Sequence, residues 1–447
     1  MSIRKFFAKL IHAIVINIYI ENNVLYIDAK LRKKDSLRCP KCRKKSPIHQ
    51  KSKKVKTWYL ENLFGLKIVI IYKPNRIKCP EHGTKTEWIP WARHKSKFAR
   101  ILEDKIAVLF KCVSKSFIQK LYEIKSFNTI SNIIERSFLD NIPKNLSENK
   151  LIRIGIDETS YKKGHKYVTI VVNHDTGEIV WVGQGKGRTT LDEFFESIPP
   201  RHRRRIELVT ADGAAWIAAS VKKYCPNAIL IMDSFHVMKW INDALNEIRI
   251  NTWKRKTQIL KEFKKDHYDE IKAGNTKILN KIGVMEDEIR TIKSSRYALL
   301  RNFEDLNEDE KSKVEIILET DSIELIEAWR IKENLHQLFT MDDSDIASLL
   351  LSDIICSARN SSNKRLNNIA DKLDKRFDNI IASNIYGMNN GRIEGINTKI
   401  KFIIRKSFGF SKIDHLTQAV MLATHEIVDI GSILIFDTGN KFQPQKL

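Results

Sequence analysis

Two knuckles near the N-terminus have the residue types and the spacing of a metal site. Two residues separate Cys39 from Cys42, and two separate Cys79 from His82. Each pair can present two ligands from one tight turn, and four such ligands close a tetrahedral Zn²⁺ site with no open coordination position. The alternative is two unrelated pairs of side chains in a reducing compartment. The complete ligand set predicts a structural zinc site.

Two aspartates farther along the chain follow short β-branched runs. Asp157 ends the run Leu151–Ile156, and Asp212 follows the run Ile206–Thr210. Two carboxylates at the ends of neighbouring strands repel each other and destabilise the fold unless a cation binds between them. Two Mg²⁺ ions would satisfy them and would orient an in-line attack on phosphorus, with a third carboxylate normally completing the site. Each aspartate alone is equally well explained as a strand end or a helix cap.

The elements that must position these aspartates are predicted from residue 150 to residue 235. Thr189 or Thr190 is expected to cap the first helix of this segment. The predicted order is β-β-β-α-β-α-β, which fits a ribonuclease-H-like α/β sheet, although other α/β folds share parts of it. The remaining predicted strands are Tyr167–Asn173, Glu178–Val182 and Ala228–Met232, and the helices are Thr189–Ser197 and 214–223.

The N-terminal region is predicted to be rich in short strands. Ile14 to Ile20 alternate and turn into Val24–Ile27, which is typical of a β-hairpin, and Val55–Glu61 with Lys67–Tyr72 could form a second one. This second hairpin would bring the two knuckles together.

Helical periodicity follows from residue 98 to residue 145, with Ser114 and Ser126 placed to cap the second and third helices. Three short capped helices in a basic context suggest a helix-turn-helix, although any small helical subdomain has a similar pattern. The residues expected away from the apolar stripe of the third helix, as DNA-contact candidates, are Asn128, Thr129, Asn132 and Arg136.

The charge balance favours a polyanionic partner. The chain has 78 Lys and Arg against 54 Asp and Glu, a net charge of +24, and neutralised phosphates release condensed counterions. A solvated basic surface is the alternative. A membrane partner is not expected, because Lys9, His12 and Asn17 interrupt the apolar stretch Phe6–Ile20. The six cysteines show no disulfide framework, which predicts a cytoplasmic protein.

Sequence blocks along nearly the whole chain point to one family. The most specific are Asp233-Ser234-Phe235-His236-Val237 and Gly391-Arg392-Ile393-Glu394-Gly395-Ile396-Asn397. In this order the blocks resemble the bacterial insertion-sequence transposases of the DDE type, in the family named for insertion sequence L-three. The other blocks are the Cys39 knuckle, Arg76–Gly83, Ile89–Ala92, Gly155–Glu158, Gly187-Arg188, Ser295–Tyr297 with Leu299-Leu300, and Ser407–Phe410.

The resemblance implies a DDE triad on a ribonuclease-H-like core. Asp157 matches the first Asp, Asp212 the second, and Glu394 the Glu, on a helix that returns to the sheet after a long helical insertion. The residues agree, since Asn390 could cap this helix, Ile393, Ile396 and Ile400 would face the core, and the helix dipole favours a carboxylate in the first turn. Asp233 is a second candidate for the middle carboxylate. His236 and Arg392 either help to position the DNA or make structural hydrogen bonds.

We therefore expect an α+β multidomain transposase that binds terminal inverted repeats and target DNA. It would use Mg²⁺ or Mn²⁺ for strand cleavage and strand transfer, as a dimer or larger assembly on the nucleoid of a bacterial cytoplasm. The rivals are a non-catalytic DNA-binding regulator, a junction or repair nuclease on the same core, and an inactive relic. The predicted division is a zinc-binding domain (1–95), a helix-turn-helix (96–148), the first part of the core (149–238), a helical insertion (239–388) and the rest of the core (389–447).

Overall fold

The computed structural model describes residues 2–63, 65–142, 151–162, 164–388, 391–407, 409–410 and 412–425. The chain divides into two compact units. The first unit comprises Met1–Glu148, Tyr161–His165 and Ile396–Leu447, and the second comprises Asn149–Ser160 and Lys166–Gly395. This division is coarser than the five segments predicted from the sequence, which remain a prediction.

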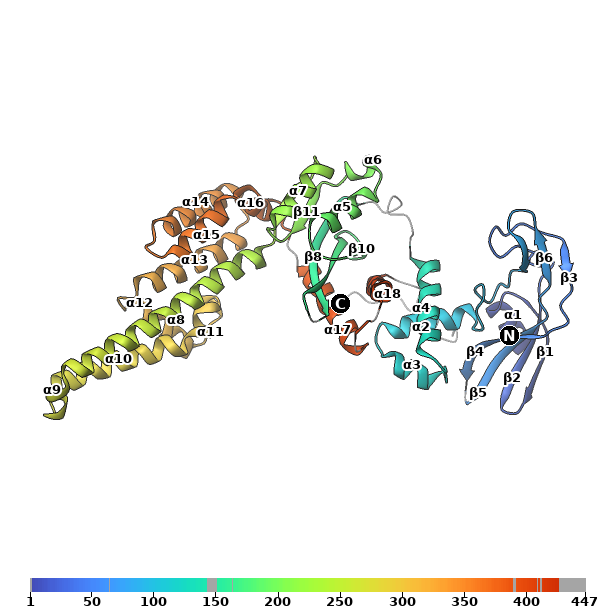
Figure 1. Cartoon of the computed structure of the whole chain (residues 1–447), viewed down its shortest axis with the longest axis horizontal. Coiled ribbons are helices and arrows are strands. Elements are labelled where there is room, and N and C mark those ends of the chain that lie inside the picture. The colour runs from blue at the N-terminus through green and yellow to red at the C-terminus, as the bar shows by residue number, and fades with distance from the viewer. Residues whose placement is uncertain are drawn as a thin grey trace. The chain divides into compact units, whose positions relative to one another are not determined.

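Two small sheets form the N-terminal part of the first unit (Figure 1). A four-stranded sheet has the order β1-β2-β5-β4 and a three-stranded sheet the order β3-β6-β7. Both predicted hairpins are present, and left-handed Asn22 and Asn23 form the turn of the first. The strands are β1 (Ile14–Glu21), β2 (Val24–Lys30), β3 (Ile48–Gln50), β4 (Lys56–Leu63), β5 (Leu66–Tyr72), β6 (Arg76–Cys79) and β7 (Gly83–Thr86).

The four-stranded sheet buries an aromatic core. Trp91 makes edge contacts with Trp58 and Tyr72, each at a ring-centroid distance of 5.7 Å. Phe7 of α1 (Ile3–Leu10) is buried in the same cluster. This apolar core fixes the start of the segment that leads into the helices.

The rest of the first unit is helical: α2 (Arg100–Phe110), α3 (Lys115–Leu121), α4 (Phe127–Asn141), the main part of α17 (Gly391–Lys406) and α18 (Ile413–Thr424). The two predicted serine caps are confirmed. The Ser114 side chain accepts a hydrogen bond from the Phe117 amide, and the Ser126 side chain accepts one from the Asn128 amide. Ile403 and Leu422, from the last two helices, join the buried core of α2, α3 and α4.

A five-stranded sheet lies at the centre of the second unit, in the order β10-β9-β8-β11-β12. β11 is parallel to both β8 and β12, whereas β10 is antiparallel to β9. Strand residues such as Ile154, Val209 and Ile170 are fully buried, as expected for strands covered on both faces. The strands are β8 (Arg153–Lys162), β9 (Lys166–Asn173), β10 (Ile179–Gln184), β11 (Leu208–Ala211) and β12 (Ile229–Met232), and the helices are α5 (Arg188–Glu196), α6 (Pro200–Arg203) and α7 (Ala215–Tyr224).

Two local predictions for this sheet are wrong. β8 does not end at Asp157 but continues to Lys162, because residues 159–162 keep an extended conformation beyond the end of β11. The N-cap of α5 is Gly187, not Thr189 or Thr190. Gly187 has φ 131°, a conformation that residues with a Cβ rarely adopt, so the helix begins directly after the glycine.

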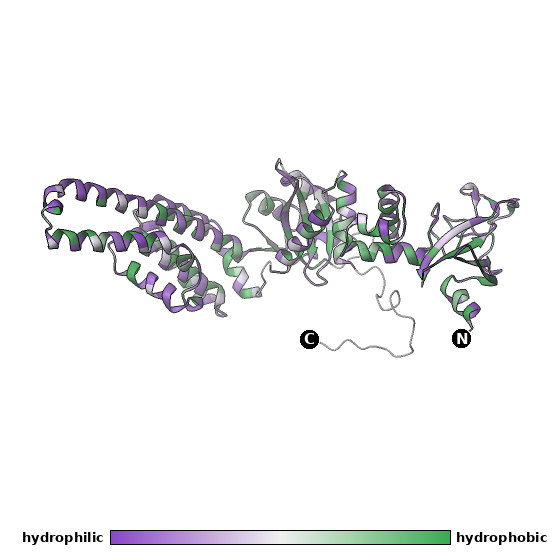
Figure 2. Ribbon diagram, turned by 90° about the horizontal axis from the view of Figure 1, so that it is seen from below, coloured by the Kyte–Doolittle hydropathy of each residue, from purple (hydrophilic) through white to green (hydrophobic). Residues whose placement is uncertain are grey.

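A long helical region follows β12. α8 and α10 run side by side as an extended pair (Figure 1), and Figure 2 shows apolar and polar residues alternating along them. Ile248 of α8 and Ile292 of α10 belong to one buried apolar cluster. The helices of this region are α8 (Ser234–Asp266), α9 (Tyr268–Lys272), α10 (Thr276–Ser294), α11 (Arg296–Leu300), the 3₁₀ turn Phe303–Asp305, α12 (Glu308–Leu318), α13 (Ile323–Thr340), α14 (Ser344–Asn360), α15 (Lys364–Asp374) and α16 (Phe377–Tyr386). In the described part of the chain, no helix is both long enough and apolar enough to span a membrane.

Candidate functional site

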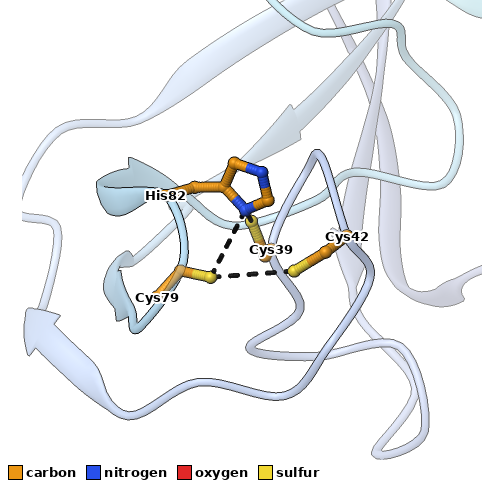
Figure 3. A group of neighbouring side chains, drawn as sticks. All are labelled: Cys39, Cys42, Cys79 and His82. Carbon is orange, nitrogen blue, oxygen red and sulfur yellow. Dashed lines mark hydrogen bonds between the residues drawn. The ribbon is translucent and has the colours of Figure 1, made fainter.

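The two predicted knuckles meet in the first unit (Figure 3). The Cys42 and Cys79 sulfurs are 3.7 Å apart, and His82 Nδ1 lies 3.8 Å from the Cys39 sulfur and 3.7 Å from the Cys79 sulfur. All four ligand atoms lie within 4.8 Å of one another. With Zn–S bonds of about 2.3 Å, a tetrahedron has edges of about 3.8 Å. The arrangement therefore fits the size of a Zn²⁺ site.

β3 follows the first knuckle and pairs with β6, which leads into the second, so this pairing brings the two knuckles together. The Arg43 amide bonds to the Cys39 carbonyl at 3.0 Å, which closes the first knuckle. The second knuckle joins β6 to β7, where Gly83 has φ 67°. Burial would raise the pKa of the Cys79 thiol, but hydrogen bonds from His82 and nearby backbone amides lower it to about 6. A thiolate at neutral pH is the form that binds zinc.

Asp157 and Asp212 lie on neighbouring strands of the second unit. The parallel register pairs Thr210 of β11 with Gly155 of β8. Continuing this register by two residues brings Asp212 opposite Asp157, so the prediction that the first and fourth strands are neighbours is confirmed. Both side chains are half-buried. Asp212 Oδ1 also accepts a hydrogen bond from the Ala214 amide at 3.1 Å, which shapes the turn into α7.

The first turn of α17 packs on the same part of the sheet. Ile393 is buried, and a Cβ added to Gly155 would lie 2.2 Å from its Cδ1 atom. A larger residue at position 155 would force the Ile393 side chain to move, and Gly155 is two residues before Asp157. Glu394 follows Ile393 and is exposed. Ile396 and Ile400 are buried as predicted. Asn390, the predicted cap, lies outside the described residues.

The three carboxylates lie on elements that meet, but they do not form a second tight cluster. Within the described ranges, the Cys/His centre is the one group of three or more such ligands close enough to share an ion.

A fourth carboxylate, Glu158, contributes to the electrostatics of this part of the sheet. Burial raises the pKa of Glu158, as do Asp212 and Asp157, although its ion pair with Lys186 at 2.6 Å opposes the shift. No local sequence signal marks the pair of Glu158 with Lys186, because the two residues are far apart in the chain.

Arg376 is a second residue that sequence reasoning missed. Its Nε and Nη2 atoms donate hydrogen bonds to the Gly213 carbonyl, at 3.0 and 2.7 Å. The guanidinium also lies 5.3 Å from the centroid of the Trp240 ring. The helical region thereby holds the residue that follows Asp212. No local sequence signal marks this contact, because Arg376 lies between two helices and has no motif around it.

The auxiliary candidates have local roles as well. Asp233 is buried and caps α8, accepting a hydrogen bond from the Phe235 amide. His236 Nε2 lies 3.8 Å from the Asp233 carboxylate. These contacts account for the conformation at the start of α8. The side chain of Arg392 lies outside the described part of the structure.

The predicted DNA-contact residues of α4 divide into two groups. Asn128 and Asn132 are exposed, and Thr129 is half-buried. Arg136 instead pairs with Glu103, a fully buried carboxylate, through Nε at 2.9 Å. Removing Arg136 would therefore perturb packing as well as any contact with a ligand.

Comparisons with known proteins cover most of the chain. Residues 154–420 match a family described as a transposase. The transposase for insertion sequence element IS1557 of Mycobacterium tuberculosis is 31% identical over 385 residues, which are 86% of this chain and 85% of that protein. The transposase for IS1001 of Bordetella parapertussis is 23% identical over 350 residues, 78% and 79% of the two chains. The family match runs from β8 through the helical region to α18 and contains Asp157, Asp212 and Glu394.

Proposed function

Because this chain belongs to the ISL3 family of DDE transposases, enzymes that cut and transfer DNA, we propose that Asp157, Asp212 and Glu394 are its catalytic triad. The observation that carries the proposal is the meeting of three separate elements. β8 and β11 are parallel neighbours, and Ile393 of α17 packs against Gly155. Three carboxylates from distant parts of the sequence would then be available at one site.

The sheet supports a ribonuclease-H-like core. Its order β10-β9-β8-β11-β12, with β8, β11 and β12 parallel and β10 antiparallel to β9, follows the β-β-β-α-β-α-β sequence expected for that core. The helical region between β12 and α17 would then be the insertion predicted for residues 239–388. Asp233, His236 and Arg392 would have auxiliary roles around the triad.

Carboxylate oxygens are suitable ligands for Mg²⁺ or Mn²⁺, so the donor chemistry of the triad fits such ions. When bound, these ions would stabilise negative charge on the reacting phosphate and favour deprotonation of the attacking group. The chain's own contribution is to hold three anionic side chains together and to orient the DNA end. Arg376 would hold the turn that carries Asp212, and Lys186 would balance the charge of Glu158.

The proposed reaction has two displacements at phosphorus. In the first, water attacks a phosphodiester at the element end, a P–O bond forms, and the bond to the 3′ oxygen of the element breaks. In the second, that free 3′-hydroxyl attacks a phosphodiester of target DNA and displaces a target oxygen. The oxygen nucleophiles come from water and DNA, so no covalent protein–DNA intermediate is expected.

The first unit would bind the terminal inverted repeats. Cys39, Cys42, Cys79 and His82 would hold Zn²⁺ as a structural ion, and α2, α3 and α4 would act as a helix-turn-helix. Asn128, Thr129 and Asn132 would face the DNA, with Arg136 supporting α4 through Glu103. Since two element ends must be joined to one target, the active form would be at least a dimer. Its substrate would be nucleoid DNA in a bacterial cytoplasm.

The test is a cleavage and transfer assay with the purified full-length protein. The substrate is end-labelled DNA that flanks the gene, with Mg²⁺, Mn²⁺ or a chelator, and with an unlabelled plasmid as target. We expect metal-dependent cuts at the element ends and labelled ends joined to the plasmid. Specific binding without cutting in any metal would favour the regulator instead. Cutting without joining, at junctions of unrelated sequence, would favour the nuclease.

A further inference from the structure

A basic cleft opens in the first unit between the zinc knuckle and the segment that leads into α2. Its volume is about 610 Å³. The cleft is lined by Arg43 of the first knuckle, by Lys56 and Thr57 at the start of β4, and by Lys95 and Lys97. The lining residues come from parts of the sequence that the fold has to bring together, so no local motif predicts the cleft.

Its cations are exposed and available. Arg43, Lys56, Lys95 and Lys97 are all exposed, and none of them forms an ion pair within the part of the chain that the structure describes. His94 lies among them, and its pKa is lowered by burial and then by Lys95, Lys85, Lys41 and Lys56. Four lysines from separate segments thus act on one side chain, which indicates a concentrated positive field.

The acidic residues of the cleft are already engaged. Glu87 is buried and accepts hydrogen bonds from the Tyr72 hydroxyl and from the Leu37 and Asn75 amides. Asp140 pairs with Arg93 at 2.7 Å and with Arg100 at 3.5 Å. Asp140 also acts on Arg43. The six arginines and lysines that line the cleft nevertheless outnumber its two carboxylates, so the cleft presents a net positive surface to a ligand.

Arg43 is held at the mouth of the cleft by stacking. Its guanidinium carbon lies 4.1 Å from the centroid of the Trp88 ring. The Trp88 amide in turn bonds to the Arg38 carbonyl at 2.7 Å. A stacked guanidinium keeps its in-plane N–H groups free for a planar or tetrahedral anion, which is how arginine recognises phosphate.

We propose that this cleft binds the phosphate backbone of duplex DNA, as an anchor separate from α4. Arginine and lysine read guanine when a helix or β-ribbon carries them into the major groove, but the cations of this cleft come from separate segments, so phosphate contacts suit them better. Asparagine and glutamine are the side chains that read adenine. Neither asparagine nor glutamine is among the described residues that line the cleft. The anchor is therefore sequence-independent. That the bound duplex is an element end rests on the proposed function, but backbone binding itself does not.

The test measures equilibrium binding by the full-length, zinc-loaded protein without Mg²⁺. Two duplexes of equal length are compared, one with the terminal repeat and one unrelated, from about 50 to about 200 mM salt. The variant Lys56→Gln/Lys95→Gln removes two cleft charges. The matched control is Lys5→Gln/Lys9→Gln, because these exposed lysines lie on α1 and do not line the cleft. Zinc content and circular dichroism verify that both variants fold.

We expect the cleft variant to bind both duplexes more weakly by the same factor, about tenfold, and its slope of log K against log salt to decrease by about 2. Lys56→Arg/Lys95→Arg should restore the slope. An unchanged slope, or an equal loss in the control, would overturn the cleft proposal while leaving the transposase proposal intact. If the unmodified protein bound neither duplex, both proposals would fail.

Discussion

At the scale of single residues, the turn after Asp212 shows how the helical region can act on the sheet. Arg376 donates two hydrogen bonds to the Gly213 carbonyl. A Cβ on Gly213 would lie 2.6 Å from Arg376 Nε and 2.7 Å from Met232 Cε, so the turn is closely enclosed. A displacement of about 1 Å costs a catalytic group much of its effect.

Arg376→Met should slow DNA cleavage by about tenfold, because hydrogen bonds from a charged donor contribute about 1.5–3 kcal/mol. DNA affinity should not change, since the first unit is proposed to bind the repeats. The measurement is single-turnover cleavage alongside equilibrium binding. Lys372→Met is the matched control, because Lys372 also lies over the Trp240 ring, at 5.4 Å, but has no bond to Gly213. Equal rates for the two variants would remove Arg376 from the account.

The Cys/His centre supports a second prediction about residues. Cys42→Ser should lower the zinc content to well below one ion per chain and abolish repeat binding, because structural zinc supplies folding free energy. Zinc is measured by mass spectrometry after gel filtration, and binding by mobility shift. Cys112→Ser is the control, since Cys112 is an exposed cysteine of the same unit outside the centre. Full zinc occupancy in Cys42→Ser would contradict the assigned ligand set.

At the scale of elements, local patterns predicted most strands and helices. Ser114 and Ser126 cap their helices, and alternating Ile14–Ile20 forms a strand, because these signals are contained within a few residues. The cap of α5 was predicted wrongly because Thr189 and Thr190 are common N-cap residues. Gly187 instead begins the helix through its backbone conformation, without a side-chain hydrogen bond. The predicted end of β8 was too early, because nothing in the sequence of a central strand indicates that it extends beyond the end of its neighbour.

The sequence predicted which carboxylates belong to the candidate site, but it did not predict the residues that contact them. Asp157 and Asp212 were predicted from the strands that they follow, and the family resemblance matched them to a triad and added Glu394. The observed order of the sheet supports the pairing of the two aspartates. The contacts of Glu158 with Lys186, Gly213 with Arg376, and Glu103 with Arg136 join residues distant in sequence. Such contacts depend on tertiary packing, so neither spacing nor composition could predict them.

Helix α4 supports a prediction about specificity. Asn132 is exposed, and asparagine reads adenine through two hydrogen bonds in the major groove. Asn132→Ala should weaken binding to the terminal repeat by about tenfold and leave binding to unrelated DNA unchanged. Competition binding measures both affinities. Asn141→Ala is the control on the same helix, because Asn141 bonds to Asp104 instead of facing outward. An equal loss on both duplexes would argue against base reading by α4.

The packing of α17 on α2 supports a prediction about pH. Burial lowers the pKa of Lys406 to about 8, and its ammonium lies 4.5 Å from the centroid of the Phe110 ring. The unfolded chain therefore binds more protons between pH 8 and pH 10.5. The free energy of unfolding should rise across this window and fall as the pH decreases through about 8. Lys406→Met should have a flatter profile in thermal unfolding, whereas exposed Lys401→Met should behave like the parent.

At the scale of the whole molecule, the parts proposed to bind DNA and the sheet proposed to carry catalysis belong to different units of one chain. The basic first unit has the proposed Zn²⁺ site and α4, and the second unit has the five-stranded sheet. The long helical region separates β12 from α17 in sequence, yet Ile393 still packs against Gly155. A net charge of +24 agrees with a DNA substrate, because each neutralised phosphate releases counterions.

The proposed triad is tested by single-turnover cleavage of the element end with four variants: Asp157→Asn, Asp212→Asn, Glu394→Gln and Asp233→Asn. These changes keep the size of each side chain but remove its charge. We expect the first three variants to lose at least about 100-fold in rate while binding the repeat normally, because metal-ion catalysis requires their carboxylates. Asp233→Asn should retain cleavage, since asparagine also caps helices. Normal cleavage by Asp212→Asn together with an inactive Asp233→Asn would contradict the proposed triad.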